Sequence, residues 1–213
     1  MTGLPGLPSF VETTSRALTS RSRLRVRPLW YNGLRCGQAF LDPHDGVLEY
    51  HVVPHDRYAS YIEAGGLRID VDGSGCPVML EVDLKSTNVL FNSDINEPRV
   101  DLLQRHRFLD FPIQHRPARI RLDRRNGLYH ITLSRRTPVE RWMFAPGAAW
   151  EVDGDSCLVG IWLADVVEDP SGCRRAAWRA GVWRAYRQGR LEELAAINSH
   201  PEAGWLSLPK IFP

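Results

Sequence analysis

The sequence predicts a mainly β protein of the α+β class. We expect two pseudo-symmetric antiparallel β-meander repeats, packed as a sandwich or barrel-like core, followed by a C-terminal helical segment. The first observation behind this prediction is a phrase that occurs twice, as VDGSGC at 71–76 and as VDGDSC at 152–157. The second is that both phrases lie in segments where apolar and polar residues alternate, as in half-buried strands. The third is a change to helical periodicity after residue 170.

Composition limits the classes of protein that need to be considered. The chain has 213 residues, of which 43% are hydrophobic and 24% charged, enough for one large core or two small ones. Its 27 basic and 25 acidic residues give a net charge of +2, so a nucleic-acid-binding function would need a local basic surface. No signal peptide or run of 18 apolar residues is visible, and the four cysteines form no CxxC motif. We therefore expect a cytoplasmic monomer or homodimer with reduced thiols and no membrane contact.

The doubled phrase belongs to a longer internal repeat. A shift of 81 residues, without a gap, places residues 41–86 beside residues 122–167, and ten of the 46 positions are identical. Average composition would give about three identities by chance. The clustering of the identities favours a tandem duplication.

Apolar and polar residues also alternate in the same phase in both copies. A shared phase tests the duplication more strictly than the number of identical residues does. A slip of one residue would turn the apolar side chains of a strand to the opposite face. The apolar positions of the first copy are Leu48, Tyr50, Val52, Leu67, Ile69, Val71, Val78, Leu80 and Val82, and those of the second are Tyr129, Ile131, Leu133, Ala148, Trp150, Val152, Val159, Ile161 and Leu163. Cys76 and Cys157 share this phase and should fill the core.

Turn signals and composition divide the chain into segments. Asp45-Gly46 and Asn126-Gly127 are hairpin signals at matching positions of the two copies. We expect a short helix near residues 101–106, between the copies. The predicted segments are a flexible N-terminus (1–20), repeat 1 (21–90), a connecting segment (91–117), repeat 2 (118–169), a helical segment (170–200) and a tail (201–213).

The two repeats resemble a group of short bacterial domains of unknown function. The resemblance is carried by NGLYHITL, PGAAWEVDGDSCLVGIWLADV and the corresponding stretch GGLRIDVDGSGCPVMLEVDL. The group shows a D-x-L-Y-I stretch, a D-x-D-x-x-G turn and a V-x-G-I-E-I strand. Met79 of the first copy departs from this pattern, where the second copy has Gly160. The resemblance implies a β-rich fold and transfers no activity.

The helical segment has an apolar stripe that should pack on another element. Ser171 is its start signal, and Gly189 and Pro201 are stop signals. At 100° per residue, the stripe consists of Ala177, Trp178, Gly181, Val182 and Ala185. We expect this stripe to cover repeat 2 near Trp162, which would leave the more polar outer face of repeat 1 open.

The same helix carries the preferred candidate for a binding surface. Six arginines fall within residues 174–190, and Trp183 lies between Arg179 and Arg187, one turn away on each side. Arginine beside tryptophan can bind phosphate, bases or an acidic protein. The structural alternative is that arginine stems cover a half-buried tryptophan, while Glu192 and Glu193 balance the charge. We therefore predict a non-catalytic binding or interaction protein with an acidic or polyanionic partner and no cofactor.

An enzyme is the alternative hypothesis. The outer face of repeat 1 holds Glu49, His51, Glu81 and Asp83, residue types suited to acid–base work or to metal-assisted hydrolysis. This hypothesis needs at least three of the four side chains to converge in a concave site. Solvated charge on the outer face of a sheet is the structural alternative. His51 and His55 do not form a metal motif on a strand, because four residues of strand span about 13 Å. The alternative is that Pro54 folds the chain back, with Asp56 as a third ligand. The sequence contains no familiar nucleophile or phosphate-binding motif.

Overall fold

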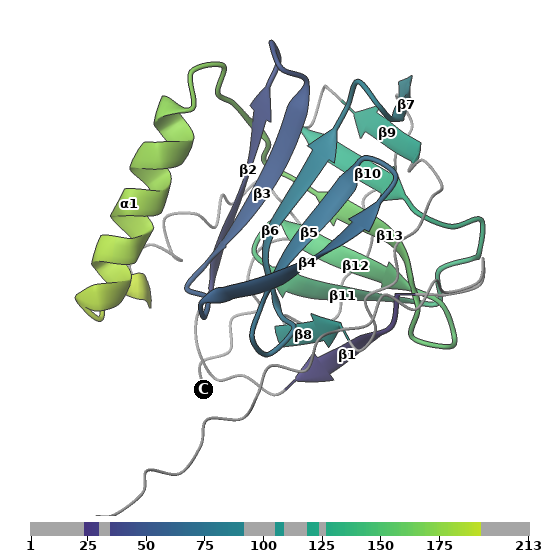
Figure 1. Cartoon of the computed structure of the whole chain (residues 1–213), viewed down its shortest axis with the longest axis horizontal. Helices are drawn as coiled ribbons and strands as arrows, with labels where there is room; N and C mark the ends of the chain where they lie inside the picture. The colour runs from purple at the N-terminus through teal and green to yellow at the C-terminus, as the bar shows by residue number, and fades with distance from the viewer. Residues whose placement is uncertain (1–23, 30–34, 92–104, 109–118, 124–126, 193–213) are drawn as a thin grey trace, which may run out of the picture.

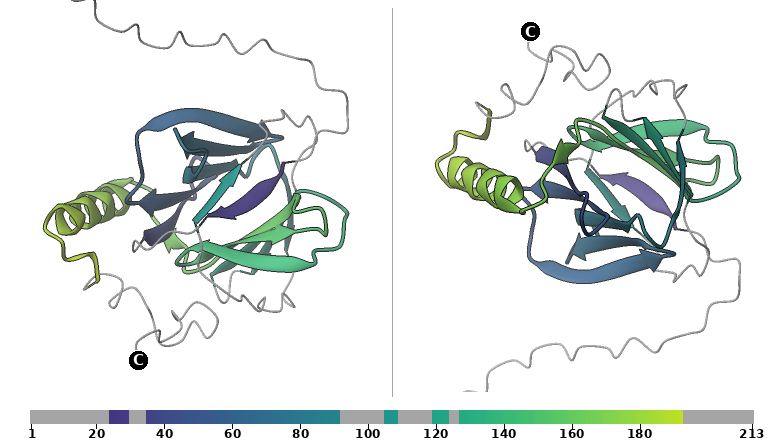
Figure 2. Two further views of the ribbon diagram at one scale, coloured as in Figure 1. Left: turned by 90° about the horizontal axis from the view of Figure 1, so that it is seen from below. Right: turned by 90° about the horizontal axis from the view of Figure 1, so that it is seen from above.

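The computed structural model describes residues 24–29, 35–91, 105–108, 119–123 and 127–192 (Figure 1). Two six-stranded sheets, one two-stranded sheet and helix α1 (Cys173–Arg187) make up the described part. The predicted mainly β fold with a C-terminal helix is therefore confirmed. The two large sheets are the layers of a sandwich, with α1 to one side (Figure 2), and the described strands form no closed barrel.

Both large sheets contain six strands, named in the order in which they lie side by side. The first sheet contains β14 (Val167–Glu168), β2 (Cys36–Asp42), β3 (Val47–Val53), β6 (Pro77–Asp83), β5 (Leu67–Asp72) and β4 (Tyr58–Ala64). The second contains β7 (Asn88–Phe91), β9 (Arg119–Asp123), β10 (Leu128–Thr132), β13 (Leu158–Leu163), β12 (Ala148–Val152) and β11 (Glu140–Ala145). The small sheet pairs β1 (Val26–Leu29) with β8 (Arg105–Phe108).

The strand order departs from a simple meander in both sheets. Strand β6, rather than β4, lies beside β3, and β13, rather than β11, lies beside β10. The last strand of each copy also crosses to the other sheet. Strand β7, at the end of repeat 1, pairs in parallel with β9, and β14, at the end of repeat 2, pairs in parallel with β2. The copies therefore exchange their edge strands.

The offset of 81 residues also relates the pairing of the strands. Leu41 lies opposite Leu48 in the first sheet, as Leu122 lies opposite Tyr129 in the second. The same holds for Tyr50 opposite Leu80 and for Ile131 opposite Ile161. Even the register shift that follows Asp70 in β5 recurs after Glu151 in β12. The shared apolar phase of the sequence thus becomes a shared pattern of strand pairing.

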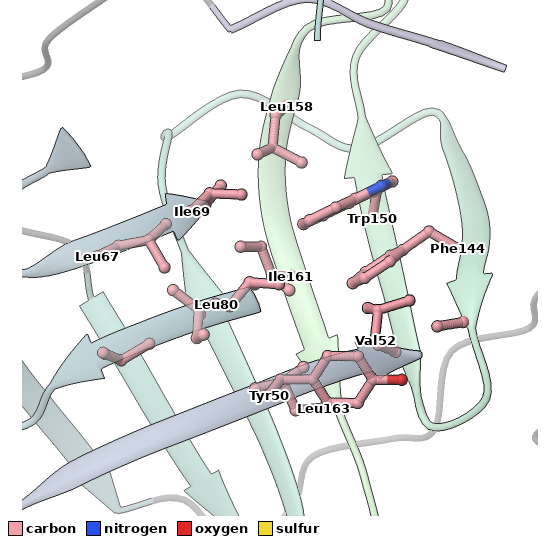
Figure 3. Packing of buried hydrophobic residues seen from close by; sticks show 14 of the residues in the cluster. Tyr50, Val52, Leu67, Ile69, Leu80, Phe144, Trp150, Leu158, Ile161 and Leu163 are labelled. Carbon is pink, nitrogen blue, oxygen red and sulfur yellow. The ribbon is translucent and has the colours of Figure 1, made fainter. Parts of the chain in front are cut away.

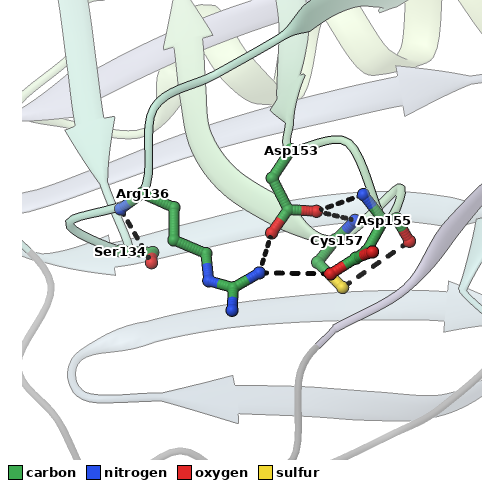
Figure 4. A network of polar contacts seen from close by, with 5 residues as sticks. All are labelled: Ser134, Arg136, Asp153, Asp155 and Cys157. Carbon is green, nitrogen blue, oxygen red and sulfur yellow. Dashed lines mark hydrogen bonds and ion pairs between the residues drawn. The ribbon is translucent and has the colours of Figure 1, made fainter.

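The doubled phrase forms the same turn in both copies. One oxygen of the Asp72 carboxylate accepts hydrogen bonds from the backbone N–H groups of Ser74 and Cys76, at 2.9 and 3.0 Å. Asp153 accepts from Asp155 and Cys157 at the same two distances. In the second copy, Arg136 also contacts the carboxylates of Asp153 and Asp155, at 2.6 and 3.3 Å (Figure 4). The repeated aspartate is therefore a turn-forming residue.

The core lies between the two large sheets. Tyr50 and Leu80 of the first sheet belong to one buried cluster with Phe144 and Ile161 of the second (Figure 3). The ring of Phe144 stacks on Trp150 at 3.7 Å and meets Tyr50 edge-on at 5.8 Å. As the phase predicts, both members of the pair Cys76 and Cys157 are buried.

Some sequence predictions are corrected and others fall outside the described residues. The short helix expected near 101–106 is wrong at Arg105 and His106, which belong to β8. Pairing with β1 satisfies the backbone there and outweighs local helix propensity. Gly46 has a left-handed φ of 67°, as a hairpin turn requires. The predictions for segment 1–20, expected to be flexible, for most of the connecting segment 91–117 and for the tail 201–213 lie outside the described residues.

Candidate functional site: helix α1 and the acidic cavity beside it

The chain reaches α1 by way of the first sheet. Strand β14 pairs Val167 with Phe40 of β2, and the backbone N–H of Asp169 then donates to the carbonyl of Leu41 at 2.8 Å. The carboxylate of Asp169, a residue only 3% exposed, accepts from the backbone N–H groups of Arg174 and Arg175. These bonds satisfy donors in the first turn of α1, which have no partner within the helix itself.

Helix α1 packs on repeat 1, so the prediction that it covers repeat 2 near Trp162 is wrong. Trp178 meets Phe40 of β2 edge-on at 5.8 Å, and Val182 clusters with Cys36 and Val53. Figure 1 shows α1 beside β2 and β3. The physical reason is β14, because its pairing with β2 carries the chain to the first sheet before the helix begins. The outer face of repeat 1 is therefore partly covered rather than open.

The buried face of α1 is also rotated from the predicted stripe. Val182 and Ala185 are buried and Trp178 is half-buried, but Ala177 and Gly181 are exposed. Trp183 is half-buried and packs against the same cluster as Val182. The contact is thus centred on Trp178, Val182 and Ala185, because the larger side chains bury more apolar surface than Ala177 or Gly181 could.

The exposed surface of α1 is strongly basic. The helix contains five arginines and no acidic residue. Arg175 pairs with Glu49 of β3. The other four are exposed, and within the described residues no acidic partner of theirs is found: Arg174, Arg179, Arg184 and Arg187. Within the described residues, an ion pair therefore neutralises one of the five helix arginines, Arg175.

The three predicted binding residues share one side of this helix. At 100° per residue, positions 179, 183, 186 and 187 fall within about 100° of one another. Trp183 meets Tyr186 at 5.7 Å and His55, from the loop after β3, at 5.3 Å, both edge-on. Tyr186 is 47% exposed. The sequence analysis did not single out Tyr186, although its position three residues after Trp183 would have indicated it.

A small acidic cavity lies beside the first half of α1. Its volume is about 230 Å³. Five carboxylates, one arginine and two apolar residues line it: Asp42, Asp45, Glu49, Glu81, Asp169, Arg175, Phe40 and Val47. Two of the carboxylates already have structural roles, because Asp42 caps a turn and Asp169 caps α1.

The four residues of the enzyme hypothesis do not converge in this cavity. Glu49 and Glu81 line it, whereas His51 and Asp83 do not. The Asp83 carboxylate accepts from the backbone N–H groups of Lys85 and Ser86 in the turn after β6. Among the residues that the structure describes, no group of three His, Cys, Asp or Glu side chains could hold a metal ion.

His51 is buried beneath α1 and electrically neutral at neutral pH. Its side chain lies 3.2 Å from the Glu49 carboxylate, which Arg175 also contacts. Burial lowers the pKa of His51 to about 4, and the Arg179 guanidinium acts in the same direction. A group with so low a pKa is a poor proton acceptor at pH 7.

The outer face of the second sheet holds a buried polar cluster that the sequence analysis did not identify. The Glu151 carboxylate, 3% exposed as a residue, lies 2.8 Å from Nε2 of His130 and accepts from Nε of Arg141 at 2.9 Å. His130 stacks on Trp162 at 4.2 Å. Burial raises the pKa of Glu151, but hydrogen bonds from its neighbours outweigh burial and lower it to about 2.

Gly160 makes room for this cluster. A Cβ atom at position 160 would lie 2.5 Å from a Glu151 carboxylate oxygen and 3.0 Å from Nε2 of His130. The corresponding residue of the first copy is Met79, whose side chain would fill the equivalent space. The difference between Gly160 and Met79 is the signal in the sequence that could have indicated this cluster.

No protein-family model matches the sequence, and no curated protein matches it. The similarity of the repeats to short bacterial domains therefore stays a prediction from their motifs. Helix α1, the longest described helix, is too short and too polar to cross a membrane.

Proposed function

We propose that this protein is a non-catalytic binding protein that docks an anionic partner on the exposed face of α1. A single observation carries the proposal: α1 has five arginines and no acidic residue, and four of the arginines are exposed without an acidic partner among the described residues. Arginines that serve only the fold would be paired or would cover apolar surface. Only Arg175 of the five makes an ion pair within the described part of the chain.

The residues between the arginines support a docking role. Ala176, Ala177, Ala180 and Gly181 are all exposed. Nothing lies within 4 Å of the position that a Cβ atom would take at Gly181. Because these side chains are small, a partner can approach the helix closely. The longer arginine side chains can then contact the partner from either side. The four free cysteines support our inference that this binding takes place in a reducing, cytoplasmic setting.

The proposal is tested with inorganic polyphosphate, a polyanion that carries charge and no other recognition feature. We expect the double variant Arg184→Glu, Arg187→Glu to bind polyphosphate at least tenfold more weakly than the unchanged protein in about 0.1 M salt. The slope of log K against log salt concentration should also become shallower by about two, because two phosphate contacts are lost. Fluorescence anisotropy at several salt concentrations measures both effects.

A matched control is Arg135→Glu, which changes an exposed arginine in the loop after β10. This variant should bind polyphosphate nearly as well as the unchanged protein. Unchanged binding by the double variant, or an equal loss in Arg135→Glu, would show that α1 is not the docking surface.

A further inference from the structure

We infer that the anionic partner is a single-stranded nucleic acid, whose bases stack on the aromatic side chains of α1 while its phosphates contact the arginines. The inference rests on the proposed function and goes further by naming the class of partner. It concerns one patch, the stacking patch, which consists of Arg179, Trp183, Tyr186 and Arg187 with His55 beside them.

The stacking patch places aromatic rings between two cations. Arg179 and Arg187 are separated by eight residues of helix, a rise of about 12 Å. Both are exposed, and Trp183 and Tyr186 lie between them on the same side of the helix. The edge-on contacts of Trp183 with His55 and Tyr186 restrict its ring. Alternating arginines and aromatic rings are the arrangement that single-strand binding proteins use to hold backbone and bases together.

The position of Tyr186 favours a nucleic acid over an acidic protein. An acidic protein would be held mainly by the arginines, whereas the exposed ring of Tyr186 lies beside Trp183 and next to Arg187, where a base could stack. A base has a flat π face that can stack on the tyrosine ring. In a duplex the faces of the bases are already stacked on one another, so a surface helix reaches them only in a single strand.

The acidic cavity determines which part of α1 is available to phosphates. Asp42, Asp45 and Glu81 line the cavity together with Arg175, in the first turn of the helix, and would repel a nucleic acid there. Arg184 and Arg187 lie in the last turn, away from these carboxylates. The field of the protein therefore favours phosphates beyond the first turn of α1, where Arg179 and the aromatic rings lie.

The test compares a labelled 15-nucleotide oligo(dT) with polyphosphate, which has the charge but no bases. We expect Tyr186→Ala to weaken oligo(dT) binding about tenfold and to leave polyphosphate binding unchanged. Tyr186→Phe, which keeps the ring, should bind oligo(dT) as the unchanged protein does. Tyr61→Ala removes a tyrosine of similar exposure, 48%, from β4, six residues further along the chain than His55, and should have no effect.

Several results would overturn the inference. They are an undiminished affinity of Tyr186→Ala for oligo(dT), a tighter binding of duplex DNA than of oligo(dT), and a tighter binding of polyglutamate than of oligo(dT) at equal charge. In each of these cases, the Arg184→Glu, Arg187→Glu variant should still bind polyphosphate more weakly than the unchanged protein does. A failure of the stacking inference is therefore distinguishable from a failure of the proposed docking function.

Discussion

At the residue scale, the two copies of the doubled phrase differ at one strained position. Ser156 has a left-handed φ of 58°, and Gly75, the corresponding residue of the first copy, has a φ of 78°. A side chain in this region costs about 1–2 kcal/mol, whereas glycine costs about 0.5–1 kcal/mol in chain entropy. We expect Ser156→Gly to raise the free energy of unfolding by about 0.5–1 kcal/mol. Urea denaturation measures the change.

The first copy supplies the controls for this prediction. Gly75→Ser should lower the free energy of unfolding by a similar amount, because it introduces the same strain. Ser74 lies in the same turn without a left-handed φ, so Ser74→Gly should be slightly destabilising. If Ser156→Gly and Ser74→Gly had the same effect, backbone strain at position 156 would not contribute to stability.

Glu151 predicts a specific dependence of stability on pH. Its pKa of about 2 in the folded protein lies below its ordinary value of 4.5. Its ionised form therefore stabilises the fold fully above pH 4.5, and this contribution is lost as the pH falls toward 2. We expect Glu151→Gln to cost on the order of 3 kcal/mol at pH 7 and much less near pH 2. Denaturation at several pH values tests this, and a cost independent of pH would contradict it.

At the element scale, the strands could be predicted from sequence and the position of the helix could not. Alternation identifies the buried side of β3 through Leu48, Tyr50 and Val52, because every second side chain of a strand faces the core. It also aligns β3 with β10, since both copies keep the same phase. Alternation does not predict the strand order. It indicates which face of a strand is buried, but not which other strand pairs with it in the sheet.

The helix shows the same limit more clearly. The start near Ser171 and the end before Gly189 follow from local signals that act within one turn. Its docking depends on β14, a strand of only two residues, Val167 and Glu168, which carries no periodicity of its own. The candidate residues Arg179, Trp183 and Arg187 were visible because they lie within one helix. The contacts of Glu151 with Arg141 and His130 join three strands and left no local pattern.

At the scale of the whole molecule, the shared core predicts that both sheets unfold together. Leu80 and Ile161 occupy corresponding positions on the two sheets, and both are fully buried in one cluster. We expect a single unfolding transition, seen equally by far-UV circular dichroism and tryptophan fluorescence. Leu80→Ala and Ile161→Ala should each lower its free energy by about 2–5 kcal/mol. Two transitions, each shifted by only one of these substitutions, would show that the sheets are independent units.

The exchange of β7 and β14 has a consequence for assembly. Two separate chains that exchanged strands in this way would be held together by mass action and would come apart on dilution. In this protein both copies belong to one chain, so each sheet receives its sixth strand from a covalently attached neighbour. The completion of both sheets is therefore a unimolecular event, and dilution cannot remove the strand that either sheet borrows from the other copy.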